Sequence, residues 1–193
     1  MKRPLVLACA IGLVVAATSA ALLARAHSVS ARTTSQALVI ASAAMPAFSE
    51  EKWPFLMDQW GLGRAFHCDA AHCGVAVDVY VRPKIGFCNC TTGVSDDDEL
   101  ERVGDVELIG EKYKPASAGH PIAVAWMKGR SRPYDVAGRA AGTTLALAFN
   151  DRCDVIVATA VVPNGAAARI EPAVLAFLNS DTLMKWAKEQ LGL

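Results

Sequence analysis

The chain has 193 residues, of which 53% are hydrophobic, and its 19 basic and 19 acidic side chains give a formal net charge of zero. A length in this range suggests a single domain that is large enough to bury a substantial core. The even balance of charge gives no support to nucleic-acid binding, which requires a strongly basic face.

The first 26 residues have the pattern of a secretory signal peptide. Lys2 and Arg3 precede an uncharged apolar run over residues 5–24, and an A-x-A sequence ends at Ala26. We therefore expect cleavage near Ala26 and a periplasmic or secreted protein, since the many Ala and Gly residues are typical of a bacterial chain. The alternative is an uncleaved anchor in the inner membrane facing the periplasm, because residues 5–24 are long enough to span a bilayer.

Export would determine the charge and the redox chemistry of the mature chain. Cleavage removes three of the 19 basic residues, so 16 basic and 19 acidic residues would remain, a net charge of −3. The periplasm is oxidising, and cysteines there form disulfides. Residues 27–48 are small and polar, which predicts a flexible tether, and residues 49–193 are expected to form one disulfide-stapled domain.

Residues 50–61 are predicted to form a short helix at the start of this domain. Pro54 suits a first helical turn, and Gly61 suits a stop. Trp53, Met57 and Trp60 would then share one face, and large apolar side chains at that spacing usually cover a core. The alternative interpretation is an aromatic ligand box or a contact with a membrane interface.

Strand patterns occupy the middle of the chain. Val75, Val77, Val79 and Val81 recur at every second position, which is a strong strand signal, and residues 69–72 have the length of a hairpin loop. Strands are expected at residues 64–68, 73–82, 85–90, 121–127, 143–150 and 153–162, with a shorter candidate at 106–110.

Helix signals lie between these strands and at the C-terminus. Ser95 before the acids at 96–99 predicts a helix that ends near Gly104, because the hydroxyl caps free N–H groups and acids suit the first turn. Pro172 lies near the start of one C-terminal helix, and Asp181 caps another that ends at Gly192. These elements predict an α+β domain with a mainly antiparallel sheet, a short N-terminal helix and two C-terminal helices.

Five cysteines follow the predicted signal peptide: Cys68, Cys73, Cys88, Cys90 and Cys153. An odd number leaves one thiol over, or requires a pairing between chains. Cys68 and Cys73 flank the 69–72 loop, so their Cα atoms can lie near the ~5.5 Å that a disulfide needs. We expect this bridge to form.

Cys88 and Cys90 point to the same face if both lie on a strand, because side chains alternate with a period of two. The first interpretation is structural: one of them, assigned as Cys88, bridges to Cys153, the other is a buried thiol, and no cofactor is expected. The second is a soft-metal site for Cu(I) or Zn(II), formed by these three cysteines with His67 or His72. The third is thiol–disulfide exchange by a strained C-x-C bridge.

Two charged clusters also allow functional interpretations. The acids at 96–99 are consecutive and cannot converge as calcium ligands, so a capped, solvated helix turn is favoured. Lys128, Arg130 and Arg132 are expected in an exposed turn over residues 128–135, either solvated or in contact with an anionic ligand or partner. The sequence has no nucleophile-elbow, zincin or P-loop motif, and a Ser–His–Asp triad is defined by space rather than by sequence.

The blocks KIGFCNC (84–90), WMKGRSR (126–132) and FLNS (177–180) resemble a recurring type of small exported bacterial protein of unknown role. The layout is also similar to that of the invasion-associated locus B family, with an early close cysteine pair and a late F-x-x-x-C, here Phe149 and Cys153. The C-x-C pair and the lack of a second late cysteine depart from that family. The resemblance implies export and attaches no established activity.

We therefore expect a non-enzymatic envelope protein that binds an envelope partner or a small ligand. The alternative, from a different functional class, is a soft-metal carrier or thiol redox protein that uses Cys88 and Cys90.

Overall fold

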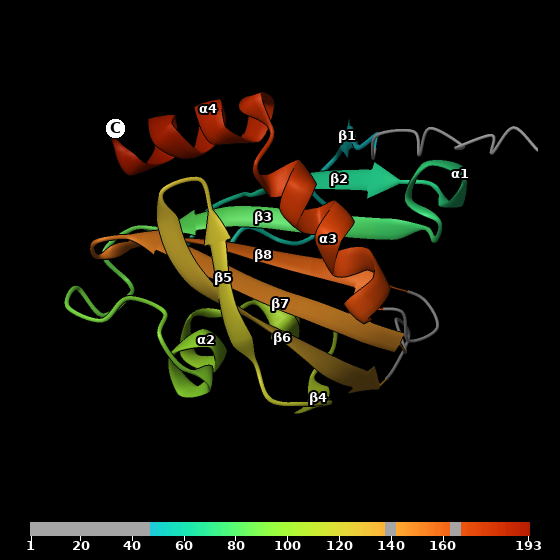
Figure 1. Cartoon of the computed structure of the whole chain (residues 1–193), viewed down its shortest axis with the longest axis horizontal. Helices are drawn as coiled ribbons and strands as arrows, with labels where there is room; N and C mark the ends of the chain where they lie inside the picture. The colour runs from blue at the N-terminus through green and yellow to red at the C-terminus, as the bar shows by residue number, and fades with distance from the viewer. Residues whose placement is uncertain (1–46, 138–141, 163–166) are drawn as a thin grey trace, which may run out of the picture. The chain divides into compact units, whose positions relative to one another are not determined.

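Eight antiparallel strands form one sheet in the computed structural model, which describes residues 47–137, 142–162 and 167–193 (Figure 1). Their order across the sheet is β1-β2-β3-β8-β7-β6-β4, and β5 also pairs with β6. β5 pairs with β6 as far as Ser131, and β4 pairs with β6 from Tyr134 onward, so the two short strands share one side of β6. The bounds are β1 (Ser49–Glu51), β2 (Arg64–Cys68), β3 (Val77–Lys84), β4 (Lys112–Pro115), β5 (His120–Val124), β6 (Met127–Ala137), β7 (Gly142–Asp151) and β8 (Asp154–Val162).

Helices cover both faces of this sheet. On one side, here called the first face, lie α3 (Ala167–Leu178) and α4 (Asp181–Leu191). On the second face lie α2 (Asp97–Val103) and the 3₁₀ helix η1 (Val106–Leu108), while α1 (Ala70–Cys73) is a single turn between β2 and β3 (Figure 1). The predicted α+β class, with a mainly antiparallel sheet and two C-terminal helices, is confirmed.

The first face holds the larger apolar core. Val79 and Val81 of β3 and Phe149 of β7 are completely buried there, beneath Val174 and Leu178 of α3. Side chains of a strand alternate between the faces, so the apolar periodicity that predicts these strands also selects their inward face.

The second face has small side chains in its centre and cations along both flanks. Ala146 and Ala148 of β7 lie opposite Thr159 and Val157 of β8, and they leave room for Leu100 of α2, which is fully buried. On the strands at either side, β3 and β6, the residues paired with these second-face positions include cations. These are Arg82 and Lys84 of β3 and Lys128, Arg130 and Arg132 of β6.

The predicted helix over residues 50–61 is wrong. Ser49–Glu51 forms β1, and residues 52–63 run as an irregular strap with one isolated bridge, between Asp58 and Gly61. Met57 is 74% exposed, so the predicted apolar helix face does not exist.

Tertiary contacts explain the irregular path of this strap. The ring of Trp53 packs edge-on against Tyr80 of β3, with 6.0 Å between centroids. Asp58 accepts a hydrogen bond from the backbone N–H of Trp60 and two more from Arg82 of β3. These contacts with the sheet, together with a local side-chain turn, outweigh the helical spacing of the apolar residues.

The strand expected at 73–82 is β3, which begins at Val77, and the strand expected at 121–127 ends as β5 at Val124. Three other segments have a different secondary structure from the one expected. Residues 85–90 form turns rather than a strand, with Gly86 at φ +67°. Residues 106–110 contain η1, not a strand. Residues 128–135 are not a turn but part of β6, where Gly129 permits a close approach of the β7 backbone that a Cβ would block. A glycine that signals a turn in sequence here serves strand packing.

The C-terminal part follows the sequence closely. β7 and β8, close to the strands expected at 143–150 and 153–162, form an antiparallel hairpin, and Gly192 ends α4 in the left-handed conformation at φ +69°. Ser180 rather than Asp181 caps α4, and Pro172 lies inside α3. The predicted signal peptide and all of the predicted tether except Ala47 and Phe48 lie outside the described residues. Within the described ranges, no helix is long and apolar enough to cross a membrane.

Candidate functional site

Two disulfides occur in the described part of the chain. Cys68 and Cys73 form the predicted bridge, with Cα atoms 6.0 Å apart, and it fastens the end of β2 to α1. The second bridge joins Cys90 to Cys153, with Cα atoms 4.2 Å apart. The assignment of Cys88 as the partner of Cys153 was therefore wrong: Cys88 is a free thiol and only 6% exposed.

The path of the loop after β3 decides which cysteine reaches Cys153. Cys153 lies in the two-residue turn between β7 and β8, next to Arg152 at φ +54°. The backbone N–H of Cys88 donates to the carbonyl of Cys153 at 3.1 Å, and the Cys88 side chain enters the core beside Leu100. Cys90, two residues on, lies at the surface and completes the bridge.

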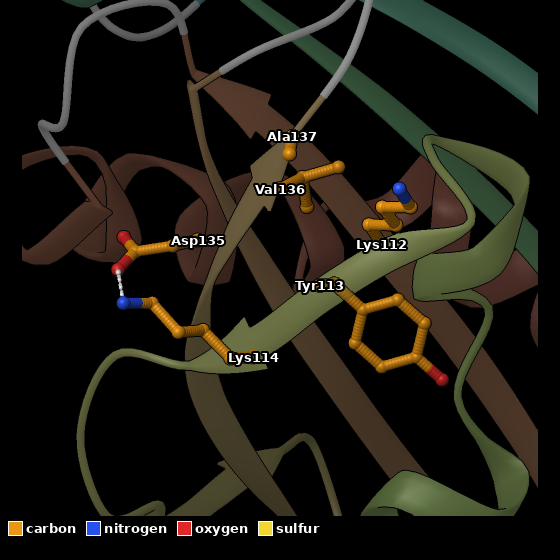
Figure 2. Close-up of a pocket in the computed structure, with 6 residues that line it drawn as sticks. All are labelled: Lys112, Tyr113, Lys114, Asp135, Val136 and Ala137. Atoms are coloured by element: carbon orange, nitrogen blue, oxygen red, sulfur yellow. Dashed lines mark ion pairs between the residues drawn. The ribbon is translucent and has the colours of Figure 1, made fainter.

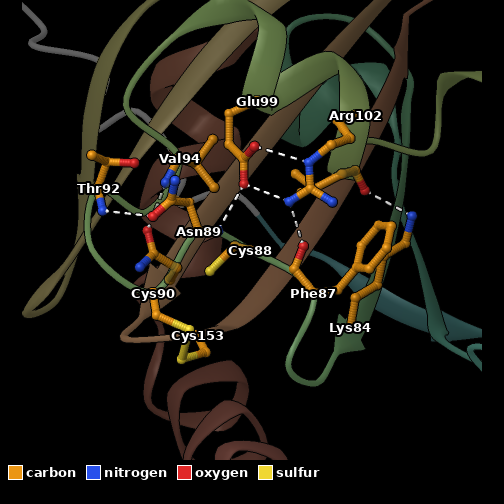
Figure 3. Close-up of polar contacts among 12 residues, drawn as sticks. Lys84, Phe87, Cys88, Asn89, Cys90, Thr92, Val94, Glu99, Arg102 and Cys153 are labelled. Atoms are coloured by element: carbon orange, nitrogen blue, oxygen red, sulfur yellow. Dashed lines mark hydrogen bonds and ion pairs between the residues drawn. A yellow bond between two sulfur atoms is a disulfide. The ribbon is translucent and has the colours of Figure 1, made fainter.

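Residues 85–96, which join β3 to α2, are here called the cysteine loop. Side chains of helix α2 hold this loop from one side, as Figure 3 shows. Glu99 accepts a hydrogen bond from the backbone N–H of Asn89 at 2.9 Å, and Arg102 donates to the carbonyl of Phe87 at 2.7 Å. The guanidinium of Arg102 also bonds Glu99, which holds the pKa of that carboxyl below its usual value. The acids at 96–99 are therefore more than a solvated first turn of the helix, because Glu99 anchors the cysteine loop.

Asn150 holds the other end of the loop. Its side-chain carbonyl accepts from the backbone N–H of Val94 at 3.0 Å, and its amide donates to the carbonyl of Arg152 at 2.9 Å. Gly93 lies directly against the Asn150 side chain, so any Cβ at position 93 would clash. The loop is therefore fixed to the β7–β8 turn by a disulfide and by side-chain hydrogen bonds.

A hollow of about 250 Å³ opens beside this disulfide. Two of its lining side chains, Lys128 and Arg152, are cationic, and no lining residue in the described ranges carries a carboxylate. Arg152 has one ion-pair contact among the described residues, to Asp151 at 3.5 Å, and Lys128 has none. The lining consists of Cys90, Thr91, Thr92, Gly93, Trp126, Lys128, Asn150 and Arg152.

The free thiol of Cys88 is poorly suited to attack a disulfide at neutral pH. Burial, with a smaller contribution from the charges of Glu99 and Asp154, raises the pKa of Cys88 to about 11. Only the thiolate is nucleophilic, so Cys88 behaves as a buried structural thiol in this state.

The two histidines predicted as metal ligands do not lie beside Cys88, Cys90 and Cys153. His67 Nδ1 lies 2.7 Å from Asp78 Oδ1, and His72 Nδ1 lies 2.8 Å from Asp69 Oδ1. Both pairs lie where β2 ends and β3 begins, whereas the cysteine loop follows the other end of β3. Across the described residues, no group of three or more His, Cys, Asp or Glu side chains is arranged to hold a metal ion.

Two of the three cations predicted as a partner contact are paired within the chain. Arg130 donates to Asp97 of α2, and Arg132 lies 3.6 Å from both Asp97 and Glu101. These pairs clamp α2 to β6 across the second face. Lys128, two residues before Arg130 in β6, is the member of the set that lines the hollow.

A buried ionic cluster on β3 escaped the sequence analysis. Asp105 accepts hydrogen bonds from two nitrogens of Arg82, both at 2.6 Å, and lies 2.7 Å from Lys84 Nζ. Arg82 also binds Asp58 of the strap. Arg82, Lys84 and Asp105 are at most 3% exposed. The sequence Arg-Pro-Lys at the end of an apolar strand could have indicated buried cations. Their acidic partners could not be identified from the sequence, because they lie more than 20 residues away along the chain.

A Ser–His–Asp row does exist, but it is not arranged for catalysis. Ser49, His67 and Asp78 lie opposite one another across β1, β2 and β3. The Ser49 hydroxyl donates to the backbone carbonyl of His67 at 3.3 Å. Nothing in the described structure links that hydroxyl to the imidazole, which general-base activation requires.

Two further hollows lie away from the cysteines. One of about 280 Å³ is lined by residues 112–114 of β4 and residues 135–137 at the end of β6 (Figure 2). Its exposed Lys114 lies 4.0 Å from Asp135, a long surface ion pair. The other, of about 320 Å³, lies between β1, β2 and the α3–α4 junction.

Comparisons of the chain with protein-family models, with curated proteins and with solved structures found no match in any of the three.

Proposed function

We propose that this chain is an exported, non-enzymatic domain of the bacterial envelope that binds a small anion in the hollow beside the Cys90–Cys153 disulfide. The observation that carries the proposal is the pairing of Lys128 and Arg152 in one concavity to which no described carboxylate contributes. Charges of one sign that line a cleft focus the local electric field and attract an oppositely charged ligand. The hydroxyls of Thr91 and Thr92 supply hydrogen-bonding groups that orient it.

The chemistry of the lining favours binding over catalysis. Its hydroxyls have no described acid or imidazole among the lining residues to activate them. The nearby Cys88 thiol is protonated at neutral pH. Export is supported by the N-terminal sequence pattern and by two disulfides, which persist in oxidising compartments.

A titration with inorganic phosphate, sulfate and citrate tests the binding proposal. The measurement is chemical-shift change in NMR spectra of the disulfide-intact protein, which detects weak affinities. Replacing Lys128→Gln and Arg152→Gln together should weaken binding about tenfold or more, because each cation makes a charge-assisted hydrogen bond. Lys114→Gln is the matched control, since it removes an exposed lysine outside the hollow. Equal affinity in the double variant and the control would refute the assignment.

N-terminal sequencing of protein from the envelope fraction tests export. The sequence should begin at His27. Full-length protein in the cytoplasm would contradict the proposal, and full-length protein in the membrane would instead favour the anchor interpretation.

A second candidate is a soft-metal or thiol redox role of the reduced protein. It is favoured by the backbone hydrogen bond that places Cys88 beside Cys153, because reduction of the bridge would leave three thiols close together. Titration of the reduced protein with Cu(I) tests it: stoichiometric binding that is lost in both Cys88→Ser and Cys90→Ser supports the role. An absence of stoichiometric binding ends it.

A further inference from the structure

The hollow has one aromatic wall, provided by Trp126. This residue lies in the tight turn between β5 and β6, lines the hollow and is 46% exposed, which makes it one of the few large apolar side chains at the described surface. A half-exposed indole at the rim of a polar concavity offers a flat apolar face to a bound molecule.

Contacts with the C-terminal helices hold the turn that carries Trp126. Ala125, the other turn residue, has φ +51°, and its N–H donates to the side chain of Asn179 at 2.7 Å, which ties the turn to the α3–α4 junction. Lys188 of α4 places its ammonium 5.2 Å from the centroid of the Trp126 ring system. These contacts hold the indole in place before any ligand arrives, which lowers the entropy cost of binding.

The positions of the other groups follow from strand geometry. Lys128 is the second residue of β6, two residues after Trp126 of the turn, and both residues line the hollow. Asn150 lies directly opposite Lys128 in the β6–β7 register, and Arg152 follows at the turn. The hollow therefore combines one apolar face, two cations, two hydroxyls and an amide.

We infer that the anion taken by this site is a monosaccharide that carries a phosphate or carboxylate group, an inference that rests on the proposed anion-binding function. A pyranose ring has a face of C–H bonds that packs on an indole and a rim of hydroxyls that pairs with threonine and amide groups. Apart from Trp126, a glycine and the disulfide, the lining side chains are polar or charged, which suits a ring edged with hydroxyls better than an aryl ring. A volume of about 250 Å³ suits one sugar ring with one anionic group, since pockets for drug-sized ligands start near ~300 Å³.

Isothermal titration of the disulfide-intact protein separates the alternatives, with glucose 6-phosphate, glucuronate, inorganic phosphate, glucose and phenyl phosphate as probes. Glucose 6-phosphate should bind about fivefold or more tightly than inorganic phosphate, because the ring adds a stacked contact to the anion site. Trp126→Ala should reduce that affinity to the level of inorganic phosphate and leave phosphate binding unchanged. Leu62→Ala, which removes another exposed apolar side chain, should leave both affinities unchanged.

The outcomes distinguish this inference from the function on which it rests. Equal affinities for glucose 6-phosphate and inorganic phosphate, or tighter binding of phenyl phosphate, would overturn the sugar assignment and leave anion binding standing. Binding by none of the anionic probes would overturn both. Urea unfolding of Trp126→Ala provides the folding check, and an exposed turn residue should change the midpoint little.

Discussion

Removing the negative charge of Asp105 should destabilise the domain severely. The carboxylate is 3% exposed and accepts from two guanidinium nitrogens of Arg82 at 2.6 Å, with Lys84 Nζ at 2.7 Å. In Asp105→Asn, Arg82 would keep only the carboxylate of Asp58, which the strap holds at the edge of the cluster. Lys84 would keep only the backbone carbonyls of residues 103 and 104 as partners for its buried charge. Breaking a buried ion pair by removing one partner costs about 3–5 kcal/mol, because the remaining charge stays desolvated.

The assay is urea unfolding with both disulfides intact, and the midpoint should fall without a change in slope. In a domain of this size, a loss of about 3–5 kcal/mol lowers the melting temperature by roughly 10 °C or more. Asp58→Asn should cost less, about 1 kcal/mol, because that carboxylate is 39% exposed and water replaces the contact. Asp135→Asn, which breaks an exposed pair at 4.0 Å, is the control and should change little. Similar midpoints for Asp105→Asn and the control would refute the reasoning.

Three further predictions concern the cysteines and one histidine. Replacing both Cys90 and Cys153 by Ser removes a link across 63 residues, so unfolding should become easier by about 4 kcal/mol on the chain-entropy estimate, against about 2 kcal/mol for the short bridge between β2 and α1; equal midpoint shifts for the two bridges would contradict it. Cys88, with its pKa raised to about 11 by burial, should resist iodoacetamide at pH 8 in the folded protein and react after unfolding; rapid native labelling in peptide mass spectra would show that the thiol is accessible. The hydrogen bond and charge of Asp78 raise the pKa of His67, so this pair stabilises the fold below a pH of about 6.5 and the gain is lost as the pH rises through the folded pKa. Asp78→Asn should therefore lower stability by less than about 1 kcal/mol at pH 5.5 and not at pH 8.5; an equal loss at both values would rule out the charged pair.

Local patterns in the sequence were sufficient for much of the fold. The period-two valines of β3 report burial on one face, and the continuous apolar runs of β7 and β8 report burial on both faces, so those strands follow from the pattern. The Cys68–Cys73 bridge also follows, because its two cysteines are separated by a single tight turn. In each case the physical cause acts within about ten residues along the chain.

Tertiary structure decided the features whose causes lie far apart in sequence. The strap over residues 52–63 is irregular because Asp58 binds Arg82, a contact that no helical pattern contains. The residue that bridges Cys153 is Cys90 rather than Cys88 because α2 and Asn150 fix the path of the cysteine loop.

The candidate site depends on the same kind of contact. Trp126 lies in the β5–β6 turn, Lys128 lies on β6, and Arg152 lies in the β7–β8 turn. Only the pairing of β6 with β7 places them around one hollow. The sequence alone determined the longest strands of the sheet and the two C-terminal helices, because periodicity reports local burial. The fold determined which charges are neutralised and which remain open to a ligand, because ion pairing depends on distances that only the packed sheet sets.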